Sequence, residues 1–217
     1  MKKYVIDAKD MDSKDLNRTI KEHAPFYDKL IIENPESRHN ICAGVTEDID
    51  VQINGSVGYF AGTMVNGAKI HVTGNAGWFA GDNMTKGELI IEGTAGDGAG
   101  QGIYGGTVIV KGSTGSRTGE IMKGGTVIIG GNSGYMTGLL MMGGKLIILG
   151  DVTDDVGESI MRGTIYVLGD VKSLGKNAVM EKTTSKDQNE LKEILTEYGF
   201  ELTDDDYANF KKIVNMQ

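Results

Sequence analysis

Cysteine is almost absent from this chain, and proline and histidine are scarce. The 217 residues include one cysteine, Cys42, together with two prolines and three histidines. A single cysteine excludes an internal disulfide framework, and it excludes a four-cysteine zinc site or a cysteine-ligated iron–sulfur cluster built from this chain alone. Because the histidines are also scattered along the sequence, we expect no metal site.

The chain also lacks an excess of basic residues and any long apolar run. Its formal net charge of −8 argues against nucleic acid or an anionic membrane surface as a partner. No apolar stretch approaches the length of a membrane span, and the N-terminus, MKKYVID, turns polar before a signal-peptide core could form. We therefore expect a cytoplasmic protein.

Glycine is abundant, and it recurs with a fixed period. Thirty of the 33 glycines lie between residues 55 and 169. Three glycine columns repeat every 19 residues, starting at Gly55, Gly58 and Gly62. A fixed period of this length is typical of stacked repeats.

An apolar triplet precedes each glycine of the first column. Short β-branched runs bounded by glycine are typical of strands. A 19-residue period leaves room only for short strands and corners, so each strand must lie parallel to the strand one coil earlier. The sequence therefore predicts a mainly β protein with a parallel β-helix over residues 51–175. The triplets are Val51–Ile53, Ile70–Val72, Leu89–Ile91, Val108–Val110, Val127–Ile129, Leu146–Ile148 and Ile165–Val167.

Alternation along each strand separates inward from outward positions. The first and third triplet positions are apolar in every copy and are predicted to point inward. A column of small residues is also predicted to be inward: Ala61, Ala80, Ala99, Thr118, Thr137 and Val156. The middle triplet positions form an outer ladder that reads Gln52, His71, Ile90, Ile109, Ile128, Ile147 and Tyr166.

Four adjacent isoleucines of the outer ladder need a cover, because a contiguous apolar patch marks an interface. They are Ile90, Ile109, Ile128 and Ile147. The C-terminal helices of this chain and a partner protein are equally good candidates for the cover.

Residues 1–50 predict a small αβ cap for one end of the β-helix, where strand edges would otherwise stay unpaired. We expect strands near Tyr4–Ile6 and Lys29–Glu33, and between them a helix over Lys14–His23 with Ser13 as its N-cap.

Residues 176–217 lose the period and predict a helical C-terminal tail. One helix is expected from Ser185 or Asp187 to Tyr198, and a second over Asp205–Val214. These helices are expected to dock on the rod.

Large side chains follow the glycines of the second column at outward positions, which suits protein contact. We therefore predict a partner interface at these residues together with the four outer isoleucines. Methionines Met84, Met122, Met141 and Met142 are expected mainly to fill the core. The aromatic candidates and their neighbour are Tyr59, Phe60, Trp78, Phe79, Tyr135 and Met136.

Several patterns suggest chemistry, but a structural reading of each is favoured. Residues 100–105 read GQGIYG, a dinucleotide-binding fingerprint, yet no long helix is expected after them. Ser133 lies in an inward small-residue column rather than in a nucleophile elbow. Cys42 lies in an apolar segment, as a buried thiol would. The acidic group Asp151, Asp154 and Asp155 is expected to be a solvated loop rather than a cation site.

The glycine ladder from Gly55 to Gly169 resembles the GXGXG domain at the C-terminal end of the large subunit of glutamate synthase. Within that family, segments 34–39 and 157–175 are most similar to stand-alone B-type subunits of N-methylglutamate synthase-like and archaeal split glutamate synthase complexes. The ladder is also similar to the C subunit of formylmethanofuran dehydrogenase. The resemblance covers about residues 30–180.

This resemblance implies a right-handed β-helix without catalytic residues of its own. In fused glutamate synthases the domain packs between the glutaminase and the FMN-binding synthase domains. The implied function is a scaffold subunit with no cofactor on this chain. Its implied partners are a class II glutamine amidotransferase subunit and a synthase subunit that carries FMN and an iron–sulfur cluster.

Three alternatives stay open. The chain fits the equivalent scaffold subunit of a formylmethanofuran dehydrogenase, and an independent ester hydrolase is the enzymatic alternative. The apolar outer surface also suits a homo-oligomer.

Overall fold

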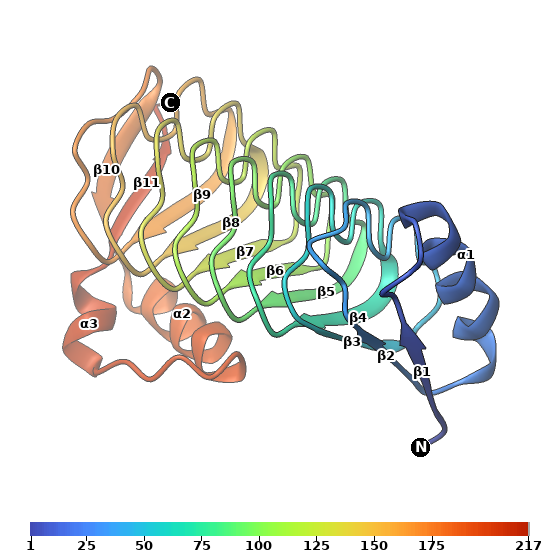
Figure 1. Ribbon diagram of the computed structural model, residues 1–217. Helices are drawn as coiled ribbons and strands as arrows, with labels where there is room; N and C mark the ends of the chain where they lie inside the picture. Colours follow the sequence, from blue (N-terminus) through green and yellow to red (C-terminus); the bar gives the residue numbers. More distant parts are fainter. Residues whose placement is uncertain (217) are drawn as a thin grey trace.

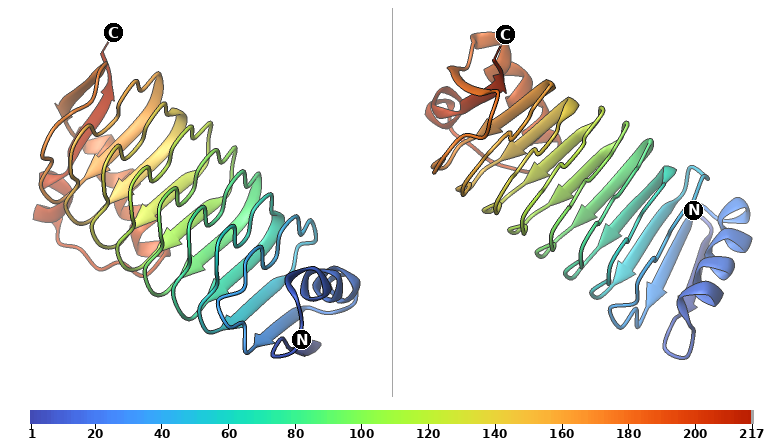
Figure 2. Two further views of the ribbon diagram at one scale, coloured as in Figure 1. Left: turned by 45° about the horizontal axis from the view of Figure 1, so that its top comes forward. Right: turned by 90° about the horizontal axis from the view of Figure 1, so that it is seen from above.

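The computed structural model describes residues 1–216, which form a rod with the two termini at opposite ends (Figures 1 and 2). The helices are α1 (Ser13–His23), the short 3-10 helix η1 (Ala24–Phe26), α2 (Ser185–Glu197) and α3 (Asp204–Asn209). The strands are β1 (Lys3–Asp7), β2 (Lys29–Glu33), β3 (Asp50–Asn54), β4 (Asn66–Val72), β5 (Lys86–Ile91), β6 (Thr107–Val110), β7 (Thr126–Ile129), β8 (Met142–Ile148), β9 (Arg162–Val167), β10 (Ala178–Lys182) and β11 (Lys211–Asn215).

All of these strands lie in one sheet with the order β1-β2-β3-β4-β5-β6-β7-β8-β9-β11-β10. Neighbours from β1 to β9 pair in parallel, and the middle residues of the triplets stand opposite one another from coil to coil, as Ile109 does with Ile128. The predicted parallel β-helix is confirmed.

Backbone hydrogen bonds also join the coils away from the sheet. Gly81 N donates to Ala61 O and Gly100 N donates to Ala80 O, each at 2.8 Å. Isolated parallel bridges such as Val57 with Ala76 continue the pairing on another side. Successive coils are therefore hydrogen bonded to each other at the corners as well as in the sheet.

The predicted inward columns are buried. The six small residues from Ala61 to Val156 are fully enclosed, as are the first and third residues of nearly every triplet. Met84, Met122 and Met141 fill a further interior column, whereas Met142 is exposed at the start of β8. Three of the four methionines thus match the predicted core role, and the prediction is wrong for Met142.

Two glycine columns solve different steric problems. A Cβ on Gly74 would lie 2.7 Å from backbone atoms of Gly55 and Ser56 in the previous coil, so this column permits close packing of coils. Gly81 instead has a φ of +73°, a left-handed backbone that side chains disfavour.

The N-terminal segment closes one end of the rod and also extends its sheet. Strands β1 and β2 continue the parallel pairing. Helix α1 lies beyond them at the end of the rod (Figure 2). Its Leu16 and Ile20 are buried against the interior core. The predicted N-cap Ser13 is wrong, because Asp12 accepts the capping hydrogen bond from Asp15 N at 2.7 Å and Ser13 is the first helical residue.

The C-terminal segment, residues 176–216, turns back over the outer face of the sheet (Figure 1). Leu191 and Leu195 of α2 join a second apolar cluster with the outer ladder, where Ile109, Ile128 and Ile147 are fully buried. Of the two covers that the sequence left open, this chain therefore supplies its own. These three isoleucines are buried by the chain itself and are not exposed to a partner.

The predicted second helix over Asp205–Val214 is wrong beyond Asn209. Residues Lys211–Asn215 form strand β11, which pairs antiparallel with β9 and places Ile213 in the interior core. Without β11, the backbone N–H and C=O groups along the edge of β9 would lack partners. A strand can hydrogen bond to these groups and a helix cannot, so residues 211–215 form a strand. Strand β10 then pairs antiparallel with β11 and was not predicted.

A buried polar network fixes the start of α2 to the sheet. Asp187 accepts hydrogen bonds from Tyr166 Oη at 2.7 Å, from Lys212 Nζ at 3.1 Å and from Thr184. Burial alone would raise the pKa of Asp187, but these hydrogen bonds lower it well below the ordinary value. The same network raises the pKa of Tyr166 through burial and the neighbouring carboxylate.

Gly87→Ala tests the close packing of the coils. A Cβ at Gly87 would lie 2.3 Å from Ala68 O, whereas Gly199 has a similar positive φ but no atom nearer than Lys111 Nζ at 3.9 Å. We expect Gly199→Ala to lower the free energy of unfolding by about 1 kcal/mol, the cost of the backbone conformation, and Gly87→Ala to lower it by about 3 kcal/mol or more. Urea unfolding measures both, and equal losses would contradict the packing argument.

Asp187→Asn tests the network that holds α2. Asp206 occupies the same capping-box position in α3 without the tyrosine and lysine, so Asp206→Asn is the matched control. We expect a loss of about 3 kcal/mol for Asp187→Asn and about 1 kcal/mol for the control.

The acid dependence of Asp187→Asn follows from the direction of the pKa shift. Because the pKa is lower in the folded state, the stabilisation by Asp187 is complete above the unfolded pKa of about 4 and is lost as the pH falls below it. The difference between wild type and Asp187→Asn in denaturant titrations should shrink in that range. A constant difference down to acid pH would contradict the network.

Candidate partner interface

Aromatic rings from successive coils stack on one corner of the rod. The ring of Tyr59 lies 4.8 Å from that of Trp78 with an interplanar angle of 3°, and 4.5 Å from the ring of His39. We call these three residues the aromatic stack. Phe60 and Phe79 form a second stacked pair beside it, with centroids 5.0 Å apart. The spacing between coils is close to the distance between stacked ring centroids, so aromatic residues at equivalent positions of successive coils stack on one another.

The second glycine column makes room for these rings. A Cβ on Gly77 would lie 2.5 Å from a ring carbon of Tyr59, and one on Gly96 would lie 2.3 Å from a ring carbon of Trp78. Each ring therefore packs closely against a glycine of the next coil. These contacts leave Tyr59 38% and Trp78 47% exposed.

Tyr135 and Met136 lie apart from the aromatic stack. They occupy the same corner, but two coils with Asp97 and Ser116 at the equivalent position intervene. Tyr135 is exposed, Met136 is half-buried, and partial desolvation and the neighbouring Asp155 raise the pKa of Tyr135. The structure thus brings four of the six predicted corner residues together, namely Tyr59, Phe60, Trp78 and Phe79.

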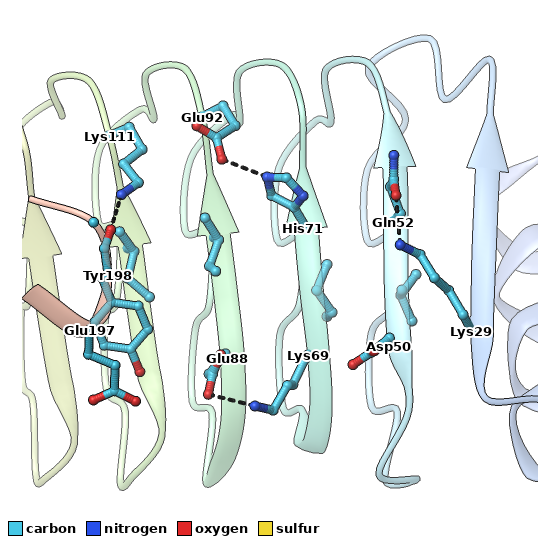
Figure 3. A pocket seen from close by; sticks show the side chains of 15 residues that line it. Lys29, Asp50, Gln52, Lys69, His71, Glu88, Glu92, Lys111, Glu197 and Tyr198 are labelled. Atoms are coloured by element: carbon cyan, nitrogen blue, oxygen red, sulfur yellow. Dashed lines mark hydrogen bonds and ion pairs between the residues drawn. The ribbon is translucent and has the colours of Figure 1, made fainter. Parts of the chain in front are cut away.

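A cleft of about 530 Å³ lies on the outer face of the sheet, where α2 ends (Figure 3). Its floor includes the outer-ladder residues Gln52, His71 and Ile90, and Glu197, Tyr198 and Gly199 border it from the C-terminal segment. Ile90 is therefore the one predicted outer isoleucine that stays partly exposed. We call this feature the sheet cleft.

Charged side chains of the sheet cleft pair across neighbouring coils. Lys69 Nζ lies 3.2 Å from Glu88 Oε1, which raises the pKa of Lys69, and His71 Nε2 lies 2.6 Å from Glu92 Oε1. Figure 3 shows both pairs bridging from β4 to the neighbouring coil. These residues and His39 of the aromatic stack were not predicted as site residues, although Lys69 and Glu88 stand one 19-residue period apart.

The two candidate nucleophiles, Cys42 and Ser133, lie inside the core. Cys42 is fully buried, and burial raises the pKa of its thiol to about 12. Ser133 is buried, and its hydroxyl is hydrogen bonded to Thr118 and Thr137 at 2.9 and 2.8 Å. Both side chains therefore pack or bond within the fold and do not face substrate.

The other chemical patterns have structural roles. Residues 100–105 form the corner between β5 and β6, with no helix after them. Asp151 accepts a hydrogen bond from Asp170 N at 2.8 Å, whereas Asp154 pairs with Lys172. Within residues 1–216, no group of three histidine, cysteine or acidic side chains is arranged to hold a metal ion.

None of the helices between residues 1 and 216 has the length and apolar character needed to cross a lipid bilayer.

Thiol labelling tests the burial of Cys42. We expect a disulfide reagent at about pH 8 to label the native protein at least about 100-fold more slowly than the urea-unfolded protein, because the thiolate is the reactive form. The unfolded sample controls for reagent activity. Labelling of the native protein at the unfolded rate would place Cys42 on the surface and contradict the structure.

Known proteins share both the sequence family and the fold of this chain. The family model described as GXGXG motif matches residues 13–215. The fold is similar to a chain in the X-ray crystal structure of the formyltransferase/hydrolase complex (FhcABCD) from Methylorubrum extorquens in complex with methylofuran. That match has a TM-score of 0.74 and 24% identity over 89% of this chain and 84% of that chain, so it shows likeness of fold. No curated protein matches. Because the family model spans almost the whole sequence, the chain belongs to the GXGXG family.

Proposed function

We propose that this chain is a non-catalytic scaffold subunit that holds other subunits of a multi-subunit complex together. The observation that carries this proposal is the aromatic stack, which is exposed and yet held rigidly by the coils on either side. Aromatic side chains with little freedom to lose are efficient anchors in protein interfaces.

The distribution of reactive groups supports a scaffold over an enzyme. An ester hydrolase needs a nucleophile that substrate can reach, and Ser133 is enclosed by threonine hydroxyls inside the β-helix. Cys42 is likewise sealed in the core. The chemistry is therefore assigned to partner subunits.

Among such complexes we favour the glutamate synthase type. The supporting residues are segments 34–39 and 157–175, which resemble stand-alone B-type subunits. In this proposal a class II glutamine amidotransferase subunit releases ammonia and a synthase subunit carrying FMN and an iron–sulfur cluster uses it. The chain itself binds both subunits and holds them next to each other.

A second candidate is the equivalent scaffold in a complex that transfers formyl groups. The likeness of fold to a chain of the formyltransferase/hydrolase complex supports it. The two candidates share the scaffold role and differ in their partner subunits.

Affinity purification of the tagged full-length chain from its native cells distinguishes these proposals. The glutamate synthase type predicts co-purification of an amidotransferase chain together with a chain that carries a flavin absorbance spectrum. Formyltransferase and hydrolase chains without flavin would support the second candidate instead. A chain that purifies alone would contradict the scaffold role.

Trp78→Ala, alone and together with Tyr59→Ala, tests the aromatic stack as an interface. We expect at least about a tenfold loss of affinity for a co-purified subunit, because anchors of this type contribute about 2 kcal/mol or more. Tyr104→Ala is the control, since Tyr104 is an exposed aromatic residue outside the stack. Urea unfolding checks that every variant stays folded. Equal affinity of the stack variants and the control would remove the stack from the interface.

A further inference from the structure

We infer that the open half of the outer sheet face binds a positively charged amphipathic helix of a partner subunit, placed end to end with α2. This inference rests on the proposed scaffold function. It concerns a different surface from the aromatic stack.

Helix α2 shows what the outer face accepts. It runs from β9, where Tyr166 contacts Asp187, back to β6, where Lys111 donates to the carbonyl oxygen of Tyr198. Leu191 and Leu195, four residues apart, pack on the outer ladder. Over β6 to β9, the outer face of the sheet thus packs against the apolar face of an amphipathic helix.

The same ladder continues over β1 to β5, where the C-terminal segment covers only part of Ile90. In order along the rod it presents Val5, Ile31, Gln52, His71 and Ile90. Val5 is 58% exposed, and the other four are partly exposed. Four strand spacings of about 4.8 Å give roughly 19 Å, the length of a helix of about 13 residues. The sheet cleft is the point where such a helix would meet the end of α2.

The charges around the sheet cleft favour a cationic occupant. The lining holds four carboxylates against three lysines, and each lysine already has an acceptor within this chain: the Gln52 amide for Lys29, Glu88 for Lys69 and a main-chain carbonyl at the end of α2 for Lys111. Two of the four lining carboxylates, Asp50 and Glu197, have no ion pair within residues 1–216. The carbonyl end of α2 adds partial negative charge at the same place. Lysine or arginine on the incoming helix would pair with these groups.

No helix within residues 1–216 fits that description. The apolar side of α1 is already buried through Leu16 and Ile20. Residues 185–209, which include α2 and α3, contain eight acidic residues against two lysines. A second copy would therefore bring like charge to the sheet cleft, so the occupant is assigned to another subunit.

A photo-crosslinking residue in place of His71 tests this placement in the full-length tagged chain within its native complex. Mass spectrometry of the crosslinked peptide should identify another subunit, with a net positive peptide whose apolar residues recur at helical spacing. The same residue in place of Glu193, an exposed position of α2, is the control and should not give that crosslink.

Three outcomes would overturn the inference: a crosslink to a second copy of this chain, a crosslink to an acidic peptide, or an intact complex with no crosslink from position 71. These outcomes do not test the scaffold function itself. The scaffold function is contradicted by a different result, namely that no other subunit co-purifies with the chain.

Charge reversal gives an independent measurement. The double variant Asp50→Lys with Glu197→Lys should weaken binding of the crosslinked subunit at least about tenfold and reduce the salt dependence of binding. Glu193→Lys with Glu201→Lys makes the same change in net charge away from the lining residues of the sheet cleft. Equal weakening by both double variants would show a general charge effect and overturn the assigned site.

Discussion

Parallel hydrogen bonding between coils holds equivalent residues about 4.8 Å apart along the rod, and every column of side chains inherits that distance. On the outside it lets Tyr59 and Trp78 stack face to face and lets Lys69 reach Glu88. On the inside it admits only small residues at the corners, which is why Ala61, Ala80 and Ala99 recur. The aromatic stack and the ion pairs of the sheet cleft thus follow from the coil spacing and from the identity of a few outward side chains.

The ends of a repeat protein need separate solutions, and here they differ. Helix α1 covers the interior at the N-terminal end. At the other end β11 pairs antiparallel with β9, so the parallel series stops. The chain between these strands then lies over half of the outer ladder and leaves β1 to β5 open. Capping one end therefore also decides which part of the outer face is available to another protein.

Much of the fold follows from the 19-residue period, because residues at that spacing stand opposite one another in successive coils from β3 to β9. The interior and outer ladders were predictable for that reason. Strand β11 was not, since Lys211–Asn215 follows a helical segment and becomes a strand only because the edge of β9 is unpaired. His39 was missed because it stands 20 residues before Tyr59, one more than the period.

The sheet cleft, like strand β11, could not be predicted from the 19-residue period alone. The Lys69–Glu88 pair is visible as residues 19 apart, but the cleft exists only because α2 ends near β6. The period determines positions within the coils, and it carries no information on where a non-repeating segment docks. Predicting that position requires the packing of Leu191 and Leu195 on the outer ladder.

Hydroxyl-radical footprinting of the free chain and of its purified native complex tests the central claim most directly, because it reports exposure residue by residue. The scaffold account predicts strong protection of Tyr59 and Trp78 in the complex, with Tyr104 modified at a similar rate in both samples. Equal modification of Trp78 in the free chain and in an intact complex would contradict the claim that the aromatic stack anchors a partner.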